Sequence, residues 1–176
     1  MMKGEKNKWD WKDQNLPISE IIRQLDTLPT EAAYALGSRG AVEAVKPLIN
    51  KLVYPPDDTV WNNLNNLAIA WALGKIKDKM AIEPLIKLLK SKSDDVRKVS
   101  AWALGQIGDK SAIPALVEAL KTDEHNSRKE DSTLCEIPDL DNPEIKSIIP
   151  YIVSTCTLSR KGSSIKQALK ELGYFS

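Results

Sequence analysis

The stretch Val96–Leu120, VRKVSAWALGQIGDKSAIPALVEAL, decides the fold of this chain. Its apolar residues recur at helical spacing on both sides of a short polar turn. Asp94-Asp95, just before the stretch, offers a helix N-cap, and Gly105 and Gly108 lie where the helix is expected to end. The stretch therefore predicts one helix–turn–helix unit.

Two imperfect copies of this unit precede it, and the tripeptide Ala-Leu-Gly marks the same point in each copy. The marker glycines are Gly37, Gly74 and Gly105, which are 37 and 31 residues apart. An alanine and two leucines follow each marker at fixed offsets: Ala44, Leu48 and Leu52; Ala81, Leu85 and Leu89; Ala112, Leu116 and Leu120. Fixed offsets of this kind indicate stacked repeats, in which one unit cannot bury its apolar face alone. We therefore expect an all-α protein with the architecture of a short α-solenoid.

The pattern Ala-x-Ala-Leu-Gly-x-Ile-x-Asp-x-x-Ala-Ile, preceded by Val-Arg, resembles the short HEAT-like repeat first named for phycobilisome (bilin) lyases. The third copy, Asp95–Lys121, fits closely. The second copy has Asn65-Asn66 in place of Val-Arg and Lys77 in place of the second Gly, and the first has Ala41 in place of Asp. The resemblance covers roughly residues 30–121 and implies an αα-superhelix of HEAT-like helix pairs. It implies no single activity, because such repeats occur in lyases, scaffolds and other proteins.

We expect four segments along the chain. Residues 1–15 form a charged N-terminal tail with Trp9 and Trp11, and residues 16–121 hold the HEAT-like repeats. Residues 122–142 break the period and are rich in Asp, Glu, Ser and Pro, which predicts an acidic irregular loop. Residues 143–176 return to helical spacing as a C-terminal capping helix pair. Helices are expected at about 18–28, 30–36, 41–53, 59–76, 79–90, 95–106, 111–121, 143–157 and 163–173.

Composition narrows the class of partner and the compartment. The chain has 25 Lys and Arg against 24 Asp and Glu, and this net charge of +1 argues against nucleic acid or an anionic membrane as partner. No apolar run approaches the ~20 residues of a membrane span, and the charged start is unlike a secretory signal. Cys135 and Cys156 suit a reducing cytosol. We expect a cytoplasmic protein that is a monomer or a weak homodimer.

The sequence offers little for catalysis or metal binding. Its single histidine, His125, falls in the predicted loop, whereas a catalytic histidine needs an oriented partner and a nucleophile within reach. One histidine and two scattered cysteines give no zinc-ligand spacing, and no phosphate-binding or dinucleotide motif occurs. We therefore expect no catalytic, cofactor-binding or metal-binding residues and no enzyme activity.

A recurring aromatic residue predicts a binding surface. An aromatic lies three residues before each marker glycine, and the helical wheel turns it away from the small and aliphatic side chains. Stacking would align these rings on the first helices, which the resemblance places on the concave side of the solenoid. Exposed Trp and Tyr are favoured interface anchors. The predicted partner-binding residues are Tyr34, Leu64, Leu67, Trp71, Lys98 and Trp102.

The sequence does not decide what covers this aromatic row. The Trp9–Trp11 arm or the C-terminal extension could fold across it, or the row could form an interface between identical chains. Arg97 and Asp109 belong to the repeat pattern, and we expect them to serve as caps and contacts between units rather than as a charged rim.

The function that we expect is a non-enzymatic protein–protein interaction module, or scaffold, which binds a peptide or protein segment on its concave helix face. The resemblance implies an alternative, a bilin-lyase-like or chaperone-like protein that handles a tetrapyrrole. A second alternative is a nucleic-acid-binding HEAT-like protein in which tryptophans stack on bases. The even mixture of basic and acidic residues argues against this second alternative, because phosphate contacts need clustered positive charge.

Overall fold

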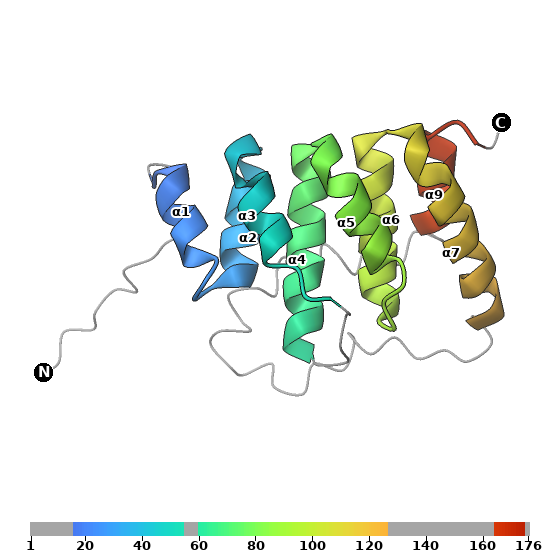
Figure 1. Ribbon diagram of the computed structural model, residues 1–176, viewed down its shortest axis with the longest axis horizontal. Helices are drawn as coiled ribbons and strands as arrows, with labels where there is room; N and C mark the ends of the chain where they lie inside the picture. The colour runs from blue at the N-terminus through green and yellow to red at the C-terminus, as the bar shows by residue number, and fades with distance from the viewer. Residues whose placement is uncertain (1–15, 55–59, 127–163, 175–176) are drawn as a thin grey trace, which may run out of the picture.

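A computed structural model describes residues 16–54, 60–126 and 164–174, and in these residues the protein is built of helices (Figure 1). The helices are α1 (Ile18–Gln24), α2 (Pro29–Ser38), α3 (Val45–Asn50), α4 (Val60–Ile76), α5 (Ile82–Leu88), α6 (Asp94–Ile107), α7 (Ile113–Asn126) and α9 (Ser164–Glu171). The short 3-10 helices η1 (Val42–Ala44), η2 (Lys79–Ala81) and η3 (Lys110–Ala112) lead into α3, α5 and α7. The all-α prediction is confirmed.

The helices form two layers along the long axis of the molecule. The first helices of the units, α2, α4, α6 and α9, stand side by side in that order (Figure 1). The second helices, α3, α5 and α7, each pack against the first helix of the following unit. α1 lies beside α2 at one end of the stack. Because the order in space follows the order in the chain, the predicted short α-solenoid is confirmed.

Pairs of small residues set the spacing between neighbouring first helices. A Cβ atom added to any of the three marker glycines would lie within 3.0 Å of an alanine Cα on the next first helix. The pairs are Gly37 with Ala72, Gly74 with Ala103, and Gly105 with Ala168. The marker glycine is therefore a contact inside the helix. The prediction that Gly105 lies at the helix end is wrong, because α6 continues to Ile107 and is ended by Gly108.

A residue in the left-handed conformation follows the end of each first helix, three residues after the marker position. These residues are Gly40 (φ 62°), Lys77 (φ 63°), Gly108 (φ 78°) and Gly173 (φ 74°). Lys77 adopts the conformation although a side chain makes it unfavourable by roughly 1–2 kcal/mol. The same count places Lys170 at the marker position of α9. α9 is therefore the first helix of a fourth unit.

Several helix boundaries differ from the prediction. α6 begins with Asp94, and its N-cap is Ser93, whose Oγ accepts a hydrogen bond from the Val96 N–H at 3.5 Å. α7 continues to Asn126, so the first five residues of the predicted loop at 122–142 are helical. The tail at 1–15, the rest of that loop and the predicted helix at 143–157 lie outside the described residues.

Polar side chains at one repeat position hold the loops that join the units. Asn66 and Arg97 each lie eight residues before a marker glycine. Asn66 is fully buried, and its amide accepts from the Val53 N–H at 3.0 Å and donates to the Val53 carbonyl at 3.3 Å. Arg97 donates to the carbonyls of Ser91 and Lys92, both at 2.9 Å. Asn66 therefore replaces the arginine of the repeat pattern in position and in role.

Candidate interaction face

The structure buries most of the predicted patch. Tyr34 and Trp71 are only 3% and 9% exposed, and their ring centroids lie 5.0 Å apart at an interplanar angle of 55°. Leu64 and Leu67 are buried as well. Lys98 and Trp102 are partly exposed. The expectation of an exposed row is therefore wrong for Tyr34, Leu64, Leu67 and Trp71.

The helical wheel failed because it allowed each first helix a single packing direction. The wheel predicted that the aromatic rings point away from the second helices. A first helix in a stack, however, also packs against the first helices on either side of it. A Cβ on Gly37 would lie 2.9 Å from Trp71 Cζ3, and a Cβ on Gly74 would lie 2.9 Å from Trp102 Cζ3. Each tryptophan ring thus covers the glycine of the preceding unit and joins the two units by apolar burial.

Polar side chains lie beside the tryptophans on the first helices α4, α6 and α9. We define the first-helix face as the surface of α4, α6 and α9 that carries Lys75, Lys98, Trp102, Gln106 and Glu171. The exposed Lys75 holds its Nζ 5.6 Å from the centroid of the Trp71 ring, a cation–π contact. Gln106 Nε2 donates to Glu171 Oε2 at 3.4 Å, which links α6 to α9.

Sequence reasoning missed Lys75. Lys75, Gln106 and Glu171 occupy the same repeat position, one residue after the marker, and Ser38 is the equivalent in the first unit. The recurrence of a polar residue at this offset was the signal that could have identified it.

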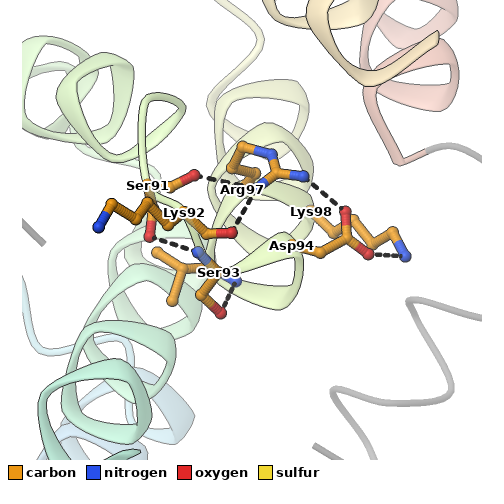
Figure 2. A network of polar contacts seen from close by, with 7 residues as sticks. Ser91, Lys92, Ser93, Asp94, Arg97 and Lys98 are labelled. Carbon is orange, nitrogen blue, oxygen red and sulfur yellow. Dashed lines mark hydrogen bonds and ion pairs between the residues drawn. The ribbon is translucent and has the colours of Figure 1, made fainter. Parts of the chain in front are cut away.

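A polar network lies at the start of α6 (Figure 2). Asp94 Oδ1 accepts from Arg97 Nη2 at 3.1 Å, and Asp94 Oδ2 forms an ion pair with Lys98 one turn later. In Figure 2 the Arg97 guanidinium lies between Asp94 and the loop at Ser91 and Lys92, whose carbonyls it binds. The network therefore anchors the Lys98 side chain and gives Arg97 the structural role that the sequence predicted.

Asp109 joins two units at the opposite end of the helices. Its carboxylate accepts from the Ser111 N–H at 3.0 Å at the start of η3 and lies 3.0 Å from Lys79 Nζ of the preceding unit. The Ser111 hydrogen bond, with a further contribution from Lys79, lowers the pKa of Asp109 to about 2. Asp109 thus acts as a cap and as a contact between units, and that prediction is confirmed.

Within 16–54, 60–126 and 164–174, no group of three or more His, Cys, Asp or Glu is placed to hold a metal ion. Within the same ranges, no helix is long and apolar enough to cross a membrane. His125 lies in α7 rather than in a loop, and Cys135 and Cys156 lie outside the described residues.

The repeat geometry has a counterpart among known families. Residues 61–135 match the family model for HEAT repeats, and this range contains nearly all of α4 together with α5, α6 and α7. No curated protein matches the chain. The match is to HEAT repeats in general and does not single out the bilin-lyase type. Together, the stacked helix pairs and this match support a HEAT-like repeat protein.

Proposed function

We propose that this chain is a protein–protein interaction module that binds a peptide or protein segment on its first-helix face and catalyses no reaction. HEAT repeats generally mediate interactions between proteins, and stacked units present the extended surfaces that such interactions use. The alignment of equivalent positions on α4, α6 and α9 supports this proposal, because it brings the polar side chains of successive units to one surface.

The partial exposure of Trp102 is the observation that carries the proposal. Tyr34 and Trp71, its equivalents in the preceding units, are buried, and the equivalent in the next unit is the exposed, polar Gln167. Trp102 is therefore partly accessible to solvent among polar neighbours. Partly exposed tryptophans are favoured anchors of interfaces, because a partner removes their remaining apolar surface from water.

Site-directed photo-crosslinking tests this proposal. A photoreactive amino acid at Gln106 samples the first-helix face, and the same amino acid at the exposed Glu83 of α5 samples the second helices. We expect adducts with one defined protein from position 106, and their loss when Trp102→Ala is added. Adducts from position 83 alone, or equal yields with and without Trp102→Ala, would contradict the proposal.

A further inference from the structure

Two lysines share the first-helix face with Trp102, one from each of two neighbouring units. Lys98 lies one turn before Trp102 on α6, so that the two side chains share a face of the helix. Lys75 follows Gly74, the residue that the Trp102 ring covers on α4, and its ammonium group lies on the Trp71 side of that glycine. Trp102 and Lys98 thus lie one turn apart on α6, and the Lys75 ammonium group lies 5.6 Å from the Trp71 ring on the neighbouring α4.

The charges of the two helices are separated along their length. Lys75 is the only charged residue within α4. α6 carries Asp94 and Asp95 in its first turn, where they favour the positive end of the helix dipole, and Asp95 is buried. No acidic residue of α4 or α6 lies beyond that first turn. The next carboxylate on the first-helix face is that of Glu171 on α9, which accepts a hydrogen bond from Gln106, so the excess of positive charge is confined to α4 and α6.

We infer that the segment bound here is acidic, with an apolar side chain next to one or more carboxylates. This inference rests on the proposed function. The apolar side chain would pack on the exposed part of the Trp102 ring, and the carboxylates would pair with Lys75 and Lys98. Asp94 already pairs with Lys98, so a carboxylate of the partner shares that ammonium group with it. Lys75 contacts the Trp71 ring, and a partner carboxylate can approach it without displacing a described acidic residue.

A random peptide library displayed on phage and selected on the whole protein tests this inference. We expect enriched peptides to carry Asp or Glu beside an aliphatic or aromatic residue. The affinity of a labelled, enriched peptide is then measured by fluorescence anisotropy. Lys75→Glu is expected to weaken binding about tenfold or more, since like charges would then face each other, and the affinity should fall as salt rises.

Matched variants separate charge from folding. Lys46→Glu reverses an exposed lysine on α3, in the other layer, and should change the affinity less than about twofold. Lys75→Gln should give a peptide affinity between that of the wild type and that of Lys75→Glu, and its circular dichroism spectrum should be unchanged. Lys98→Glu is the second reversal on the face and should weaken binding as well.

The outcomes distinguish this inference from the proposed function. Enriched peptides that lose affinity in Trp102→Ala but are neutral or basic, or that bind Lys75→Glu normally, would overturn the inference and leave the proposed function standing. Peptides that are insensitive to Trp102→Ala and to both lysine reversals, or an empty selection, would overturn both. A thymidine 12-mer that binds more tightly than any peptide, with the same Lys75 dependence, would replace the acidic peptide by nucleic acid.

Discussion

The substitution Gly74→Ala has two opposing effects on stability: it raises helix propensity, and it disturbs the packing between units. In an isolated helix, Gly→Ala is favourable by about 1 kcal/mol, because glycine loses more backbone freedom on folding. In this protein the new Cβ would lie 2.8 Å from both Cα and Cβ of Ala103 and 2.9 Å from Trp102 Cζ3. Carbon atoms pack best at about 3.5–4.0 Å, so α4 and α6 would have to separate by about 1 Å.

Packing should dominate this balance. Overfilling a packed interior costs about 1–3 kcal/mol, and the upper end applies because Ala103 Cα moves only with its helix. With the gain of about 1 kcal/mol in propensity subtracted, we expect Gly74→Ala to lower the free energy of unfolding by about 1–2 kcal/mol.

The three marker glycines form an internal series. A Cβ on Gly37 would lie 2.6 Å from Ala72 Cα, the tightest backbone contact of the three. On Gly105 it would lie 3.0 Å from Ala168 Cα and 2.7 Å from Glu171 Oε2, and the carboxylate can swing aside. The expected order of destabilisation is therefore Gly37→Ala, then Gly74→Ala, then Gly105→Ala.

Urea unfolding followed by circular dichroism at 222 nm measures the series, with the m-value checked for each variant because repeat stacks can unfold in parts. If the three variants were each stabilised by about 1 kcal/mol, propensity would dominate and the close contact between first helices would be refuted. A reversed order, with Gly105→Ala the most damaging, would also refute the reasoning.

Further predictions concern the core, a loop, a carboxylate and the ligand class. Trp71→Ala should lower the free energy of unfolding by about 3–5 kcal/mol in the same assay, and Trp102→Ala by about half as much or less; equal losses would contradict the different burial of the two rings. Asn66→Ala should lower it by about 1–3 kcal/mol, because it leaves the Val53 N–H without its side-chain partner, and amide exchange at Val53 should quicken. Asp109 should titrate near pH 2 by NMR, below its usual value of 3.8; its ionised form then stabilises the fold above about pH 4, and this contribution is lost as the pH falls through 2, whereas Asp109→Asn should lack that dependence. Mixing the protein with free bilin should leave the bilin absorbance unchanged, and a shift would favour the tetrapyrrole alternative over the proposed function.

The repeat pattern predicted the fold because each of its features encodes a contact. The apolar residues at fixed offsets after the marker lie in or next to the second helices. Asp109 caps η3 and pairs with Lys79 of the preceding unit, as its position indicated. The departures at Asn66 and Lys77 were visible in the sequence, but not their outcome. Asn66 still holds the preceding loop, and Lys77 still takes the left-handed conformation.

The candidate site was predicted less well, for a physical reason. A helical wheel describes one helix against one core, whereas the burial of Trp71 depends on how far the neighbouring α2 lies and on the missing side chain of Gly37. Lys98 and Trp102 kept partial exposure, while the rest of the predicted patch became interior. Lys75 contacts the Trp71 ring one turn before it on α4, and it was missed because only the aromatic positions of the repeat were followed to the surface.

Contact between a glycine on one unit and an alanine on the next gives the array a polarity. Each unit offers a socket at its marker glycine and a matching alanine on its opposite flank, so units add in one direction only. Lys170 occupies the equivalent position of α9, where a side chain would meet the alanine of a further unit packed at the same distance. To extend this array by design, Lys170 would first have to be replaced by glycine, and the incoming helix would have to carry the alanine.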